Sequence, residues 1–219
     1  MKKITFLLLI LWISSFNAQN YSFDFLTKYI STSSDPKMTE SRDLVTYFNT
    51  DDFSYYLTLR KTSTGFYGYL TDEHKKTMHK FDVTEDQKDG EVEFSFNYTG
   101  TRKLSGHPVN LKKVRIQYEE MASDSVKLKI FKNESATKPE REYVLKLKKA
   151  NKNLFPIARI VMMHPYEAAT AVDFGRNIVV EKAIDICIEK RCNCDITLAE
   201  YKNVELDLQL PKELKFVIY

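Results

Sequence analysis

Glu91-Val-Glu-Phe-Ser-Phe-Asn-Tyr98 is the stretch of sequence that decides the fold class. Its apolar residues, Val92, Phe94, Phe96 and Tyr98, alternate with polar ones, so the two kinds of side chain fall on opposite faces of an extended chain. This period of two is typical of a β-strand with one apolar face and one hydrated face. Such strands belong to antiparallel sheets, which can leave one face in water.

The same alternation recurs along most of the chain. Further runs with apolar residues two apart lie at residues 53–60, 114–119, 126–130, 142–148 and 204–210. Turn signals separate the runs, as in Asn49-Thr-Asp-Asp52 and Thr62-Ser-Thr-Gly65. Counting all candidates gives about 11 strands. The sequence therefore predicts a mainly β protein, built as an antiparallel half-open barrel or a strongly curved sheet.

One segment, at residues 153–172, breaks this alternation. Its apolar residues take a helical spacing, and Pro156 is tolerated in a first helical turn. Pro165 ends or kinks this helix, and residues 166–172 are predicted to form a second short helix. The sequence thus predicts a single β-rich domain over residues 19–219, with a short helical insertion near 153–172.

The first 18 residues have the pattern of an export signal. A basic start, Met1-Lys-Lys3, precedes an apolar run from Ile4 to Ile13, and mostly small or polar residues follow up to Ala18. The run is about 10 residues long, whereas a membrane-spanning helix needs about 20. We therefore expect residues 1–18 to be a cleaved signal peptide and the protein to be exported, either to the periplasm or out of the cell.

The charge balance gives no reason to expect a nucleic acid as partner. Without Lys2 and Lys3, the 33 basic residues become 31, against 30 acidic ones. Binding to a phosphate backbone depends on a basic surplus. A lysine-rich stretch at residues 146–152 is either a hydrated strand end and turn, or a contact for anionic lipid head groups or an acidic partner.

Two parts of the chain resemble a known superfamily. Tyr47-Phe-Asn49, Phe53-Ser-Tyr-Tyr56 and Tyr69-Leu-Thr-Asp72 resemble early strands of the periplasmic lipoprotein-carrier (LolA-like) superfamily. Tyr201-Lys-Asn-Val204 and Leu210-Pro-Lys-Glu-Leu-Lys-Phe216 are similar to its closing strands. The resemblance implies a half-closed antiparallel barrel, in which helices cover an apolar cavity for acyl chains. The late position of the helical segment departs from that pattern, and no functional residue of the superfamily aligns with this chain.

The three cysteines, Cys187, Cys192 and Cys194, lie close together in sequence. In an exported protein this favours a disulfide. A two-residue hairpin turn would place Cys187 opposite Cys194. A three-residue turn would instead pair Ile184 with Ile196 and keep the apolar face continuous, which argues against that bridge. A disulfide of unknown pairing is therefore predicted here.

No arrangement of residues indicates an enzyme. The chain contains neither a Gly-x-Ser-x-Gly elbow nor a phosphate-binding glycine loop. Cys192-x-Cys194 lacks the second pair that a zinc site needs. The histidines are not spaced as a metal motif and are expected in loops or at the surface, at His74, His79, His107 and His164. We therefore expect no catalytic residue, metal or other cofactor.

The helical segment is the candidate binding element. Phe155, Ile160, Met163 and Tyr166 either form a lid over a ligand or pack the helix onto the open face of the sheet. The predicted function is non-enzymatic binding of an apolar ligand, such as a lipid or acyl chain, in a β-barrel cavity. The alternative is a structural or adaptor protein of the cell envelope, with a packed core and no ligand. The oligomeric state is left open.

Overall fold

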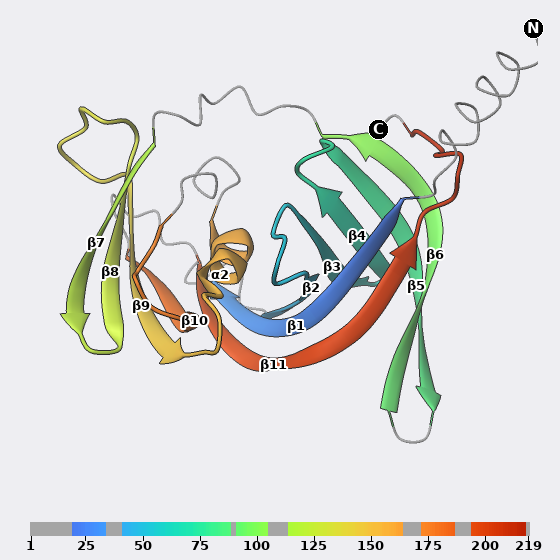
Figure 1. Cartoon of the computed structure of the whole chain (residues 1–219), viewed down its shortest axis with the longest axis horizontal. Helices are drawn as coiled ribbons and strands as arrows, with labels where there is room; N and C mark the ends of the chain where they lie inside the picture. The colour runs from blue at the N-terminus through green and yellow to red at the C-terminus, as the bar shows by residue number, and fades with distance from the viewer. Residues whose placement is uncertain are drawn as a thin grey trace, which may run out of the picture.

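The computed structural model describes residues 19–33, 41–88, 91–104, 114–163, 172–186 and 194–217. These residues form one sheet of eleven antiparallel strands together with one short helix (Figure 1). The predicted fold class, a mainly β and strongly curved sheet with a helical insertion, is confirmed. The predicted signal peptide lies outside the described residues. Within the described ranges, no helix combines the length and the hydrophobicity needed to cross a membrane.

The sheet consists of two meanders that meet at the first and last strands. The first meander comprises β1 (Asn20–Ser33), β2 (Arg42–Phe48), β3 (Tyr55–Thr62), β4 (Gly65–Asp72), β5 (Thr77–Lys88) and β6 (Glu91–Lys103). The second comprises β7 (Arg115–Ala122), β8 (Ser125–Phe131), β9 (Arg141–Lys149), β10 (Ile178–Ile186) and β11 (Cys194–Gln209). The strand order β6-β5-β4-β3-β2-β1-β11-β10-β9-β8-β7 places β1 beside β11 in the middle of the sheet.

Strands β1 and β11 are the longest and give the sheet its curvature. Their pairing is irregular between Phe23 and Phe25, and again between Lys28 and Tyr29. Irregularities of this kind bend a strand and increase its twist. Figure 1 shows both strands curving beneath α2 (Phe155–Met162), which lies on the concave side of the sheet.

Two clusters of buried side chains stabilise the curved sheet. The helix-side core lies between α2 and the strands β8–β10, and includes Tyr29, Val126, Leu145, Phe155 and Val180. It covers the concave face of the second meander. Because α2 lies over only this half, the helix does not cover the same face of β2–β6.

The strand-side core lies on the opposite face of the first meander. It includes Tyr21, Phe23, Leu57, Leu70 and Phe81, and the end of β11 covers it. Each of the two cores therefore contains residues of β1 and residues of β11.

The alternation predicted from the sequence is confirmed in most strands. In β8, for example, Val126, Leu128 and Ile130 are all buried. Val92 is an exception, with 46% of its surface exposed. It lies near the tip of the β5–β6 hairpin, which projects beyond the rest of the sheet (Figure 1), so no neighbouring element covers it.

The helix is shorter than predicted, because it begins at Phe155 and ends at Met162. The Asn153 side-chain oxygen accepts a hydrogen bond of 3.1 Å from the backbone N–H of Phe155. Met163 is already extended, so the chain leaves the helix before the proline that was expected to end it. The second predicted helix falls almost wholly outside the described residues.

The predicted register between β10 and β11 is wrong by one residue. Ala183, rather than Ile184, is paired with Ile196. Ala183 is 1% exposed and Ile184 is 36% exposed, so Ile184 lies on the outer face. The inner face carries Asp185 instead, whose carboxylate accepts a 2.8 Å hydrogen bond from the partly buried Arg141. A partly buried ion pair thus occupies a position where the apolar pattern predicted the outer face.

Candidate ligand-binding cavity

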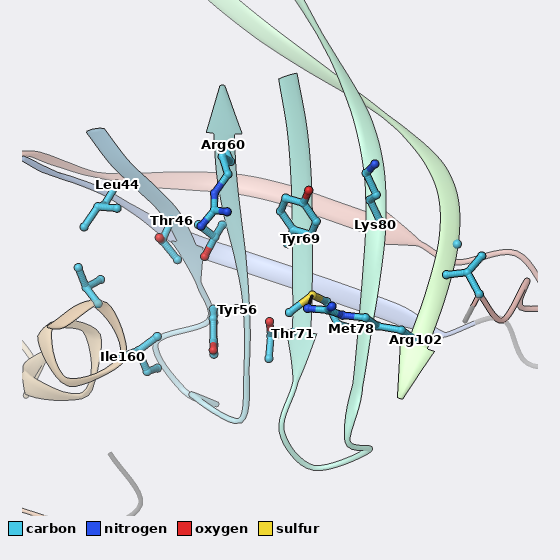
Figure 2. A pocket seen from close by; sticks show the side chains of 14 residues that line it. Leu44, Thr46, Tyr56, Arg60, Tyr69, Thr71, Met78, Lys80, Arg102 and Ile160 are labelled. Carbon is cyan, nitrogen blue, oxygen red and sulfur yellow. Dashed lines mark hydrogen bonds between the residues drawn. The ribbon is translucent and has the colours of Figure 1, made fainter. Parts of the chain in front are cut away.

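A cavity of about 630 Å³ lies above strands β2–β6, on the same face of the sheet as α2 (Figure 2). Ile160 and Val161 of α2 form one side of it, and Val217, near the C-terminus, lies at the other. The first meander supplies the floor. The cavity therefore occupies the part of this face that α2 leaves uncovered.

The strand register places the floor residues in rows. Thr46, Thr58, Tyr69, Lys80 and Gly100 are successive cross-strand partners from β2 to β6. Cross-strand partners share a face of the sheet, so these side chains form one row across the floor. Hydroxyl groups dominate the row, and a lysine lies near its β6 end.

A second row lies two residues further along the strands. Phe48, Tyr56, Thr71, Met78 and Arg102 are again successive partners from β2 to β6. Phe48 belongs to the helix-side core, and the other four line the cavity. Burial raises the pKa of the Tyr56 hydroxyl, which disfavours its phenolate form still further.

The floor rests on a packed core. Residues that alternate with the floor residues, such as Tyr47, Leu57, Leu70 and Phe81, point to the opposite face and form the strand-side core. Packed interiors leave side chains little freedom to move. The strands that carry the floor are therefore held in place from behind.

A C-terminal segment, residues 210–217, forms the far rim. The backbone N–H of Thr101 donates to the Lys215 carbonyl at 2.8 Å, and the N–H of Val217 donates to the Thr101 carbonyl at 2.9 Å. Gly100 permits this approach, because a Cβ atom there would lie 3.1 Å from Val217 Cγ1 and 3.4 Å from the Lys215 carbonyl oxygen. Because Gly100 has no side chain, the C-terminal segment can lie against β6 and form the rim.

The charged residues of the lining are all basic. They are Arg60, Lys80 and Arg102, and no Asp or Glu is among the residues that line the cavity. The Lys80 ammonium lies 4.2 Å from the centre of the Tyr67 ring. Arg102 Nη2 donates to the sulfur of Met78 at 3.1 Å. Within the described part of the chain, none of the three forms an ion pair, so the cavity carries uncompensated positive charge.

The candidate residues predicted from the sequence divide between the cavity and the core. Ile160 lines the cavity. Phe155 is buried against Phe174, with ring centres 4.8 Å apart, and Met163 is also buried in the helix-side core. Tyr166 lies outside the described residues. The helix therefore contributes its edge to the cavity, while its most apolar face packs on the sheet.

Sequence reasoning missed the polar residues of the floor. The alternation at residues 53–60 places Thr58 and Arg60 on the hydrated face of their strand, and the structure agrees. Alternation could not show that several such faces join into one surface, because this depends on the register of neighbouring strands. The available signal was a set of basic and hydroxyl-bearing residues at these polar positions.

One histidine was also predicted wrongly. His79 is fully buried in β5, although all four histidines were expected in loops or at the surface. Its Nδ1 lies 2.8 Å from Thr101 Oγ1 and its Nε2 lies 3.2 Å from Thr77 Oγ1. The two hydroxyl partners compensate for the loss of water around the ring.

The predicted cysteine bridge is not tested, because Cys187 and Cys192 lie outside the described residues. Cys194 begins β11, where it is paired with Ser33 of β1. Among the described residues, no group of three or more His, Cys, Asp and Glu side chains is arranged to hold a metal ion.

The chain matches no protein-family model, and no curated protein is significantly similar to it in sequence. The resemblance to the lipoprotein-carrier superfamily therefore remains a prediction. A fold by itself does not fix a function, so the function must be argued from the cavity.

Proposed function

We propose that this protein is an exported, non-enzymatic binding protein that holds an amphipathic ligand, such as a lipid or another acyl-chain compound, in the cavity above β2–β6. The observation that carries the proposal is an open cavity with apolar sides, formed by α2 and Val217, and a polar floor. Ligand sites of small molecules commonly have volumes of about 300–1,000 Å³ and combine apolar walls with a few polar groups. The cavity fits that description.

The apolar side of the cavity supports binding of an acyl chain. Leu44 of β2 lies there together with Ile160 and Val161 of α2. All three are partly buried and pack against the helix-side core. Each ~100 Å² of ligand surface that they remove from water contributes about 2.5 kcal/mol, from which the entropy cost of association is subtracted. A single chain would therefore bind with moderate affinity and exchange readily.

The proposal places the ligand on the α2 side of β2–β6 rather than inside a barrel. Both cores are clusters of the protein's own buried side chains, whereas the cavity is open to the outside. A ligand on this face leaves both cores intact. Binding then requires no unfolding of the sheet, and the edge of α2 is the element that contacts the chain.

Calorimetric titration of the purified protein with decanoate tests the proposal. We expect saturable binding, and we expect Ile160→Asp to weaken it about tenfold, because a carboxylate replaces an apolar contact. Ile184→Asp is the matched control, since Ile184 is exposed on the outer face of β10. Native mass spectrometry of the freshly purified protein would show copurified lipid. Absence of both copurified lipid and decanoate binding would refute the proposal and favour a structural or adaptor protein.

A further inference from the structure

We propose that the cavity selects ligands with an anionic head group, a carboxylate or a phosphate, which binds at the β5–β6 end while the chain extends toward α2. The proposal deepens the proposed function and rests on it for the apolar part of the ligand. Arg102 is the main contact for the anion. Lys80, on the neighbouring strand β5, and Arg60, on β3, add positive potential.

The two ends of the cavity differ in chemistry. Leu44, Ile160 and Val161 lie at the α2 end, whereas Lys80 and Arg102 lie on β5 and β6. The hydroxyl groups of the floor lie between these ends, across β2–β4. An amphipathic anion bound along this axis buries its chain against apolar side chains and places its charge beside cations.

The guanidinium N–H groups of Arg60 and Arg102 remain available to bind a ligand. Arg60 makes no hydrogen bond or ion pair with another described residue, and the Met78 sulfur that Arg102 contacts is a weak acceptor. Other arginines of the protein have strong acceptors: Arg115 donates to the Ala136 carbonyl at 2.6 Å, and Arg176 donates to both carboxylate oxygens of Glu120. A guanidinium group binds carboxylate or phosphate through two parallel hydrogen bonds.

The arginines also point into the cavity. Figure 2 shows the Arg60 side chain turned toward Thr46, and the Arg102 side chain lying along the floor toward Met78 and Thr71. Lys80 instead contacts the Tyr67 ring, so its charge contributes from the edge. Asp82, two residues further along β5 and opposite Tyr67, is exposed and does not line the cavity. The charged residues of the lining itself are therefore all cations.

Titrations with decanoate, decyl phosphate, decanol, acetate and inorganic phosphate test the proposal at low and high salt. We expect both anionic amphiphiles to bind at least about tenfold more tightly than decanol at low salt, because a charge-assisted hydrogen bond forms only with them. High salt should reduce this difference, since Arg60 and Arg102 are exposed to solvent. Comparison of decanoate with decyl phosphate shows which head group is preferred.

Substitutions of individual arginines test where in the cavity the anionic head group binds. Arg102→Gln should remove most of the preference for decanoate over decanol, and Arg60→Gln should remove part of it. Arg176→Gln changes the charge equally but outside the cavity, so it should leave the preference intact. Circular dichroism confirms that each variant is folded.

The possible failures are distinguishable. Equal affinity for decanoate and decanol would overturn the head-group proposal and leave the proposed function standing. Acetate or phosphate binding as tightly as decanoate would support an anion site and refute the acyl-chain function. No binding of any compound would overturn both.

Discussion

At the scale of single residues, His79 shows how burial controls a titratable group. Burial lowers its pKa from 6.5 to about 4, an effect that nearby Lys75 increases and Asp72 opposes. The neutral ring bridges Thr77 and Thr101, and Tyr98 also hydrogen-bonds Thr101, at 2.6 Å. Because Tyr98 accepts a hydrogen bond from the Lys215 N–H, this network reaches the segment that forms the cavity rim.

The lowered pKa of His79 makes stability depend on pH. The unfolded chain binds a proton at this histidine near pH 6.5, and the folded protein does so only near pH 4. The contribution is therefore complete above about pH 7 and is lost as the pH falls from 6.5 to 4, by on the order of 3 kcal/mol. Urea unfolding of the wild type and His79→Gln between pH 7 and 5 measures it. The variant should lose less stability than the wild type over this range, and identical slopes would contradict the assignment.

At the scale of elements, the sequence predicted which residues form strands more accurately than it predicted which residues contact one another across the fold. Runs such as Val126, Leu128 and Ile130 have one apolar face that must be buried, so alternation identified them. It failed where a polar group is buried with its own partner, as for Asp185 with Arg141 and for His79 with two threonines. Asp185 and Arg141 are 44 residues apart and His79 and Thr101 are 22 apart, so a local pattern carries no information about these two pairs.

The cavity was only partly predictable for a related reason. Ile160 was predicted as a binding residue because the helical spacing of the apolar residues in 153–172 interrupts the alternation of the strands, and this spacing can be recognised in the local sequence. Thr58, Lys80 and Arg102 come from three strands, and only the register brings them onto one surface. The rim at Val217 depends on a contact with Gly100 that no sequence period encodes.

The contact between β6 and the C-terminal segment gives a prediction at this scale. Gly100→Ala places a methyl group 3.1 Å from Val217 Cγ1, so Val217 must shift by a few tenths of an ångström, which weakens the contact of the segment with β6. We expect faster hydrogen exchange at the Val217 amide, by about tenfold, with a loss of about 1–2 kcal/mol in overall stability. Thr99→Ala, at the neighbouring position, removes a hydrogen bond to the Lys80 carbonyl but adds no atom against the segment. Unchanged exchange at Val217 in Gly100→Ala would show that the rim is not held by this contact.

At the scale of the whole molecule, the pairing of β1 with β11 connects the two halves. Tyr21 and Phe23 belong to the strand-side core, whereas Phe25 and Tyr29 belong to the helix-side core. Neighbouring segments of one strand thus contribute to both cores. β1 and β11 lie at opposite ends of the described chain, so their pairing must close a very long loop before either core is complete.

This shared strand predicts that the molecule unfolds as one cooperative unit. Phe23→Ala removes a ring only from the strand-side core, and we expect it to cost about 3–5 kcal/mol. If β1 couples the halves, hydrogen exchange should accelerate equally in β4 and in β8, although β8 belongs to the helix-side core. Val126→Ala, which changes the helix-side core, should produce the same uniform acceleration at a smaller cost, because it removes fewer atoms. Hydrogen exchange with mass spectrometry separates the two halves by peptide. Acceleration confined to the substituted half would show that the β1–β11 pair joins two independently stable units.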